Sequence, residues 1–321
     1  MDEIKELKQN GWIYRAIHLG TNVLYEITAP EQDELPNTLY KLFTLNENSV
    51  DSLLNTYLFG CHPSQFNDLF DCHQNLVIQD DDNHNKYLLE YIKAVCVPGS
   101  LDGLNEEEMN RRVIEGGHHL AYNTFGISCF TSNPNNVLMW AYYGNNAGFM
   151  IEFDISLFPP NFQGPFPINY QKKVIPISLK ENGAPLALLY QSNVKSKSWE
   201  HECEWRYLLR TIDGKPLLPT GWFTLESMEH HNRKFSYPIK CIKSITFGNR
   251  FLVPSEIMEI TSDNILKAKF NKADDLKIKI FDFCINNQIK INYGLPNNDL
   301  MTFDFRSSRL EKKNELEYWI Y

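Results

Sequence analysis

The sequence lacks the signatures of secreted, membrane-spanning and duplex-binding proteins. Its opening residues, MDEIKELKQNGW, contain neither a basic n-region nor an apolar h-region, and no window approaches the roughly 18 consecutive apolar residues of a membrane helix. Lys and Arg number 31 against 40 Asp and Glu, so the formal charge is −9. Because generic binding to duplex nucleic acid needs clustered cations, this charge disfavours it. We expect a cytoplasmic protein with no membrane or duplex partner.

Cysteine pairing motifs are missing as well. The seven cysteines are an odd number with no CxxC pair and no repeated spacing, which predicts reduced residues in the core. Cys61-His62 and Cys72-His73 stand eleven residues apart, and a zinc site would require these four side chains to converge tetrahedrally. The alternative is that the cysteines pack in the core while the imidazoles lie near the surface. We expect that alternative, and therefore no metal.

The composition is that of a folded globular protein. Hydrophobic residues make up 43% and aromatic residues 13% of the chain, and no internal repeat indicates a solenoid or propeller. Helix and strand patterns mix without a βαβ rhythm, which predicts an α+β fold with a mixed, mainly antiparallel sheet core and flanking helices. The polar run at residues 31–37 is typical of a connector. We therefore expect an N-terminal extension over residues 1–36 and a single α+β domain over residues 37–321.

Strand composition recurs along the chain, above all in its middle part. Strands are predicted at residues 38–43, 57–64, 125–130, 148–153, 173–178, 202–209 and 242–247. Helices are predicted at residues 49–57 with Ser49 as N-cap, and at 106–115, 135–143 and 255–260. Residues 79–86, QDDDNHNK, are polar throughout and predict a surface loop. A further alternating strand and a charged tail close the chain.

The strongest local signal is the run WEHECEWRYLLR over residues 199–210. In a strand, alternate side chains share a face, so Glu202, Glu204 and Arg206 would point one way and the apolar residues the other. Two carboxylates about 7 Å apart on one strand face can take different roles if their surroundings separate their pKa values. One would stabilise positive charge on a sugar while the other orients a nucleophile. The alternative is an exposed sheet face that carries Glu–Arg ion pairs, which contribute little to the stability of the fold.

A second signal runs from a hydroxyl-rich strand end at Thr131 and Ser132 into a short helix. Trp140 and Tyr143 stand three residues apart on that helix and could form an aromatic wall over a planar ligand ring. The alternative is that both are core aromatics, which is the commoner outcome. Ser132 could equally be a helix or turn cap.

Two further groups carry candidate ligands. Asn67, Asp68 and Asp71 could bind a cation, or could order a loop through Asx hydrogen bonds, and we favour the loop. Lys41 lies next to Tyr40 in the strand TLYKLF. It could be a phosphate-binding cation or a solvent-facing strand lysine.

Five segments in this order, LYKLF, FNDLFD, GISCFTSNPNNVLMWAYYG, GFMIEFD and WEHECEWR, resemble the bacterial family catalogued as domain of unknown function 2971. The resemblance covers about residues 38–250. The family usually has a histidine where Tyr142 stands and a proline where Leu69 stands. The family name implies no activity.

The arrangement of residues is similar to that of the Arg-Ser-Glu class of ADP-ribosyltransferases. In that class a basic residue on an early strand, a hydroxyl-rich strand end and a late E-x-E strand hold NAD and stabilise an oxocarbenium-like transition state. Lys41 stands where that class has Arg or His. Our candidate catalytic residues are Glu204, Glu202 and Arg206. Our candidate NAD-binding residues are Tyr40, Lys41, Asn67, Asp68, Thr131, Ser132, Trp140 and Tyr143.

Three functions fit these residues. The leading hypothesis is an ADP-ribosyltransferase or NAD glycohydrolase that uses NAD as substrate and no metal, and acts as a bacterial toxin or antiviral defence effector. Its partners would be a small-molecule nucleotide or protein target and an operon-encoded protein. The alternative is a non-catalytic sensor that binds a ligand or a protein. The third is a metal-dependent nuclease that uses Asp68, Asp71 and Glu204.

Overall fold

The structure is a computed structural model that describes residues 3–20, 22–30, 34–95, 102–112, 125–210, 233–261, 265–271, 275–297 and 299–321. Its helices are α1 (Glu47–Leu54), α2 (Asp82–Val95), α4 (Val137–Gly144), α5 (Leu179–Asn193) and α6 (Asp275–Asn286). Residues 106–112 are helical as well. Within the described residues, no helix is long and apolar enough to cross a membrane.

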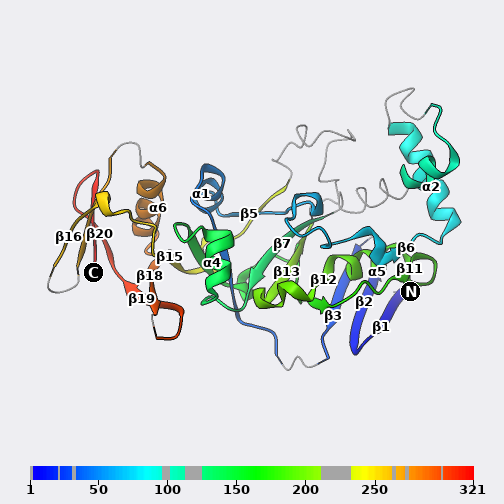
Figure 1. Cartoon of the computed structure of the whole chain (residues 1–321), viewed down its shortest axis with the longest axis horizontal. Helices are drawn as coiled ribbons and strands as arrows, with labels where there is room; N and C mark the ends of the chain where they lie inside the picture. The colour runs from blue at the N-terminus through cyan, green and yellow to red at the C-terminus, as the bar shows by residue number, and fades with distance from the viewer. Residues whose placement is uncertain are drawn as a thin grey trace.

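An eight-stranded sheet forms the centre of the molecule (Figure 1). Its strands run in the order β19 (Thr302–Ser308), β18 (Lys290–Asn297), β15 (Ile242–Phe247), β8 (Phe149–Asp154), β4 (Thr38–Phe43), β7 (Gly126–Thr131), β13 (Glu204–Leu209) and β9 (Phe162–Pro167). β15 and β18 pair in parallel, and the other neighbours pair antiparallel. The predicted fold class, α+β with a mixed and mainly antiparallel sheet, is confirmed.

Smaller sheets surround the central one. An antiparallel sheet of β1 (Glu3–Gln9), β2 (Trp12–Leu19) and β3 (Asn22–Thr28) lies at one end of the long axis in Figure 1. At the other end lies a sheet of β16 (Ile257–Ile260), β17 (Leu266–Lys269), β21 (Glu317–Ile320) and β20 (Leu310–Lys312). The two-stranded pairs are β5 (Tyr57–Phe59) with β14 (Lys234–Ser236), β6 (Val77–Ile78) with β11 (Ile177–Ser178), and β10 (Asn169–Gln171) with β12 (Val194–Ser196).

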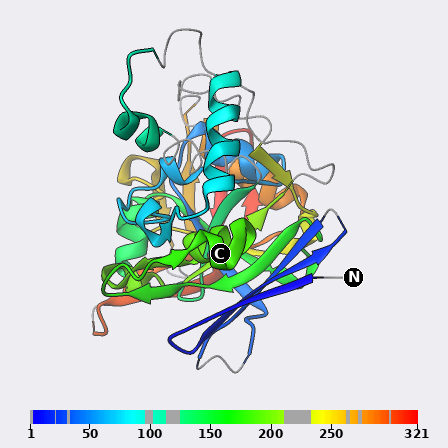
Figure 2. The same cartoon turned by 90° about the vertical axis from the view of Figure 1, so that its right-hand side faces the viewer.

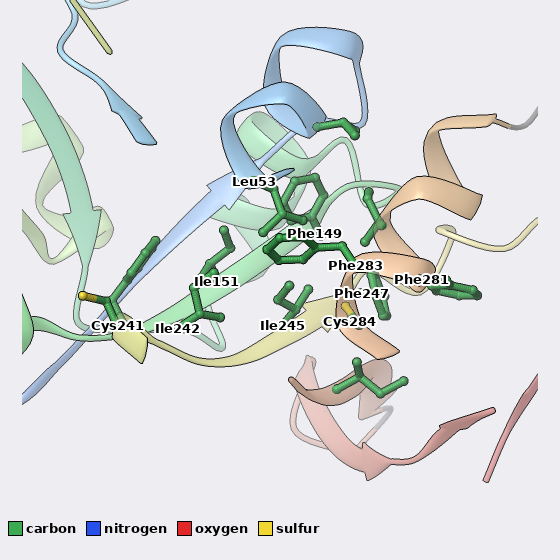
Figure 3. Close-up of a cluster of buried hydrophobic side chains, with 14 of the residues drawn as sticks. Leu53, Phe149, Ile151, Cys241, Ile242, Ile245, Phe247, Phe281, Phe283 and Cys284 are labelled. Carbon is green, nitrogen blue, oxygen red and sulfur yellow. The ribbon is translucent and has the colours of Figure 1, made fainter. Parts of the chain in front are cut away.

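Apolar side chains cover both faces of the central sheet. On one face, Phe149 and Phe247 pack beneath α1 and α6 (Figure 3). A second cluster on the opposite face includes α5 and part of the N-terminal sheet. Tyr207 belongs to the first cluster and its neighbour Leu208 to the second. This division follows from strand geometry, because successive side chains point to opposite faces.

The N-terminal sheet lies against α5 and β9 (Figure 2). Gln163 of β9 accepts a hydrogen bond from the N–H of Tyr25 at 3.3 Å and donates one to the carbonyl of Val23 at 3.0 Å. Arg210 donates to the same carbonyl at 3.1 Å. Side chains of the central sheet thus satisfy backbone groups along β3, within the segment expected to be an extension.

Two predictions in the first third of the chain are corrected. α1 begins at Glu47 rather than Ser49, because the side chain of Asn46 is the N-cap and accepts from the N–H of Ser49 at 2.9 Å. The loop predicted at residues 79–86 is wrong from Asp82 onward, where α2 begins. Asp81 accepts hydrogen bonds from the N–H groups of the two residues after Asp82 and so starts this helix.

Further corrections fall later in the chain. The helix predicted at residues 255–260 is wrong, because a 3₁₀ turn at Pro254–Glu256 leads into β16, which pairs with β17. The strand predicted at residues 173–178 is present only as β11. Neither α5 nor α6 was predicted. The helix predicted at residues 106–115 is present over 106–112, and its remaining residues lie outside the described part.

Candidate functional site

The charged motif begins in a 3₁₀ helix and ends in β13. The 3₁₀ helix covers Lys197–Glu202, and Cys203 then takes a left-handed conformation with φ 46°. The strand predicted to start at Glu202 therefore begins at Glu204. Thr131 at the end of β7 donates from its hydroxyl to the carbonyl of Glu202 at 2.6 Å. This bond fixes the turn beside the end of the neighbouring strand.

Arg206 uses all five of its N–H groups inside the protein. Nε donates to Glu204 Oε1 at 2.7 Å, and Nη2 donates to Glu204 Oε2 at 3.1 Å. Nη1 and Nη2 form a bidentate pair with Asp71 at 2.8 and 2.6 Å. Nη1 also donates to the carbonyl of Ser192 near the end of α5 at 2.8 Å, and the ring of Phe66 lies 5.3 Å from the guanidinium carbon. The guanidinium therefore joins three separate segments.

A second buried cation, Lys195, completes a cluster of five ionisable side chains. Its Nζ donates to Glu202 Oε2 at 2.5 Å and to Glu204 Oε2 at 2.9 Å, and lies 3.8 Å from Asp71 Oδ2. Each of the five side chains is at most 5% exposed. We call this group the ion cluster; it consists of Asp71, Lys195, Glu202, Glu204 and Arg206. The alternative of an exposed Glu–Arg face is wrong, since the charged face is buried.

Mutual attraction keeps Glu204 and Lys195 charged despite their burial. Burial alone would raise the pKa of Glu204, but Arg206 and Lys195 outweigh it and hold that pKa well below its ordinary value. Burial alone would lower the pKa of Lys195, but the carboxylates, Glu204 foremost, raise it. The hydroxyl of Tyr170 accepts a hydrogen bond from the N–H of Glu204 at 2.8 Å, and burial raises the pKa of Tyr170. That phenol therefore stays neutral.

Glu202, itself buried, links the ion cluster to the half-buried Tyr143. Its Oε1 accepts a hydrogen bond of 2.6 Å from the hydroxyl of Tyr143, which is half-buried on α4. Burial, and then Glu202, raise the pKa of Tyr143, while a hydrogen bond with the exposed Asn67 partly opposes them. We call Asn67, Tyr143 and Glu202 the rim.

The ion cluster carries excess negative charge. Two cations, Lys195 and Arg206, face three carboxylates, which leaves one formal negative charge. Uncompensated charge in a low-dielectric interior is costly, so a cation near the ion cluster is favoured. Within the rim, Asn67 is exposed and Tyr143 is half-buried.

The structure brings five of the predicted site residues together: Glu202, Glu204, Arg206, Tyr143 and Asn67. Trp140 is separate from them, because it is fully buried and its Nε1 donates to the carbonyl of Pro134 at 2.9 Å. Trp140 is therefore a core residue, and of the two residues expected to form an aromatic wall only Tyr143 lies in the rim.

The early strand and the hydroxyls serve the sheet. Tyr40 pairs with Thr131 and contacts the apolar cluster beneath α4. Lys41 donates to the carbonyl of Cys129 at 2.9 Å, and within the described residues no ion pair joins it to the ion cluster. Ser132 is exposed, and its hydroxyl lies 3.3 Å from a carbonyl of the turn before β13.

Asp68 has one free carboxylate oxygen but no metal-like surroundings. Its Oδ1 accepts the N–H of Phe70 at 2.9 Å, an Asx turn, and its buried Oδ2 has no hydrogen-bond partner among the described residues. A nuclease would need Asp71 and Glu204 free for a metal ion, but Arg206 occupies both carboxylates. The described part of the chain contains no group of three or more ligands suited to a metal.

The two Cys-His pairs have separate roles. Cys61 pairs with β7 through an isolated bridge, Cys72 Sγ lies 3.7 Å from Arg206 Nη1, and His73 caps a 3₁₀ helix. His62 is buried, contrary to the expectation that both imidazoles lie near the surface. The six cysteines of the described residues form no disulfide with one another.

Sequence reasoning missed Lys195. It stands in the polar run Lys195–Ser198, which has the composition of a surface loop. A weak signal existed in the charge balance: a buried E-x-E-x-R motif has more carboxylates than cations, so burial requires a further cation. Lys195 lies on β12, and the partner strand β10 carries Tyr170, whose contact with the ion cluster no sequence pattern indicated either.

Comparisons with protein-family models, with curated proteins and with solved structures gave no match. The function must therefore be argued from the ion cluster and its rim.

Proposed function

We propose that this chain is an NAD-consuming ADP-ribosyltransferase or NAD glycohydrolase, a bacterial toxin or defence effector, with Glu202 as the carboxylate that meets the substrate. The observation that supports this proposal is that Glu202, a member of a buried cluster with excess negative charge, is the one that binds the half-buried Tyr143. Cleavage of the nicotinamide–ribose bond builds positive charge on the ribose. A fixed carboxylate stabilises that charge more in the transition state than in the ground state.

The other residues have supporting roles in this proposal. Tyr143 and Lys195 each bind one oxygen of Glu202 and so fix its orientation. Glu204, the first candidate from the sequence, has both oxygens bound by Arg206 and one also by Lys195. We assign Glu204 to holding the two cations in place rather than to contact with the substrate.

The test is release of nicotinamide from NAD by the purified chain. Glu202→Gln keeps the size of the side chain and removes its charge, so we expect turnover to fall by about 100-fold or more. Glu311→Gln is a matched control, because Glu311 also binds a tyrosine hydroxyl and a lysine but lies on β20 in another sheet. Equal activity of the Glu202 variant and the wild type would contradict the proposal, as would absence of turnover in the wild type.

A second candidate is a non-catalytic binding module. It is favoured by the saturation of Arg206 and by the low exposure of the ion cluster. In that case NAD would raise the melting temperature without being consumed, as any ligand selective for the folded state does. Glu202→Gln would then remove the shift, and nicotinamide release would be absent throughout.

A further inference from the structure

Tyr14 connects the N-terminal sheet to the body of the protein through a buried hydrogen-bonded network. It is fully buried on β2, and its ring packs edge-on against Tyr190 of α5 at 5.4 Å. Its hydroxyl donates to Asn193 Oδ1 at 3.0 Å and accepts from Asn169 Nδ2 at 2.8 Å. Both asparagines are buried as well. A phenol that donates once and accepts once is satisfied without water.

Each asparagine stands next to residues that build the ion cluster. Asn169 precedes Tyr170 on β10, and Asn193 leads into β12, where Lys195 aligns with Tyr170. Ser192, the residue before Asn193, provides the carbonyl that binds the guanidinium. The side chain of Asn193 also donates to the carbonyl of Pro167, on the strand beside β13. One hydroxyl therefore binds β10, which carries Tyr170, and the last residue of α5, from which the chain enters β12 and Lys195.

We propose that Tyr14 is a positioning residue, which sets the distance between Lys195 and Glu204 through Asn193 and Asn169. The N-terminal sheet then helps to fix the geometry of the ion cluster. This inference concerns the ion cluster itself and holds for either proposed function. Its test therefore measures stability, not turnover.

Tyr14→Phe removes the hydroxyl and keeps the ring. Above the ordinary pKa of a carboxylate the lowered pKa of Glu204 contributes stability, and this contribution is lost as the pH falls. If the variant loosens the ion cluster, the pKa of Glu204 is lowered less, and less stability is lost when the pH falls. We expect the gap between the urea midpoints of wild type and variant to be widest at about pH 7 and to narrow once the pH falls below the folded pKa that Glu204 has in the variant.

The charged and titratable groups around Glu204 are Asp71, Cys129, Tyr170, Lys195, Glu202 and Arg206, and Tyr143 binds Glu202. A Tyr14 that only fills the core would give the same gap over the whole pH range in which both proteins fold, which would overturn the proposal. Tyr25→Phe is the matched control. Tyr25 is buried on the same sheet, but its hydroxyl makes no hydrogen bond to a described residue, so its gap should not vary with pH.

Hydrogen exchange on the wild-type chain gives a second measurement if Tyr14→Phe does not fold. We expect the amides of β2 and β12 to be exposed in the same opening event, with equal protection. Exchange of β2 while β12 stays protected would overturn the proposal.

Discussion

Arg206 is the residue on which the ion cluster depends most. Arg206→Met removes its five hydrogen bonds and leaves the carboxylates of Asp71 and Glu204 buried without that cation. We expect the free energy of unfolding to fall by about 3–5 kcal/mol, measured by urea denaturation. Arg15→Met is the control, since it breaks a half-exposed pair with Glu6 and should cost less than about 1 kcal/mol. Equal losses in the two variants would contradict the assigned role.

Glu204 should govern the response of stability to acid. Burial would raise its pKa, but Arg206 and Lys195 depress it below the ordinary value of 4.5. A carboxylate with a depressed pKa stabilises the fold above its unfolded pKa and loses that effect as the pH falls through the folded value. Glu204→Gln should therefore flatten the fall of the urea midpoint below about pH 5. An acid limb identical to that of the wild type would count against this electrostatic account.

At the scale of elements, helix α1 offers a direct comparison between sequence and structure. The sequence indicates Ser49 as the N-cap, whereas the structure assigns that role to Asn46. Asn46→Ala should cost about 1 kcal/mol of unfolding free energy. Ser49→Ala should change it by less than about 0.5 kcal/mol, because only the backbone N–H of Ser49 takes part. A larger loss of unfolding free energy for Ser49→Ala than for Asn46→Ala, measured by urea titration, would show that Ser49 is the N-cap.

Local patterns were enough for some elements and not for others. The strands at residues 38–43 and 242–247 have the predicted bounds, because the alternation of the first and the strand composition of the second are visible in the sequence. α5 escaped prediction because Gly183 and Pro185 interrupt its pattern, and Gly183 is non-helical at φ 76°. In the same way the E-x-E-W-R strand was visible, but its burial depends on Lys195 and Asp71 from distant segments. No local pattern contains such contacts.

At the scale of the whole molecule, strand β7 is the place where the sheet and the site are joined. β4 pairs with β7 at Thr131. Further along the same strand, at Ile127, Cys61 pairs with β7 through two backbone hydrogen bonds of 2.9 Å. Between them, the ammonium of Lys41 binds the carbonyl of Cys129. The segment that follows this bridge leads to Asp71 of the ion cluster. The contact between the segment around Cys61 and β7, which we call the crossing, therefore fixes both the pairing of β7 and the position of Asp71.

This crossing requires glycine at residue 126. A Cβ on Gly126 would lie 2.4 Å from the Cα of Gly60, which is backbone and cannot rotate away. Gly126→Ala should therefore cost about 3 kcal/mol or more and displace the loop that carries Asp71. Gly20→Ala is the control: Gly20 has φ +63° but open space around it, so only backbone strain of about 1–2 kcal/mol is expected. Urea midpoints measure both losses. A smaller loss for Gly126→Ala than for Gly20→Ala would show that the two segments can separate without cost, and that the site does not depend on this crossing.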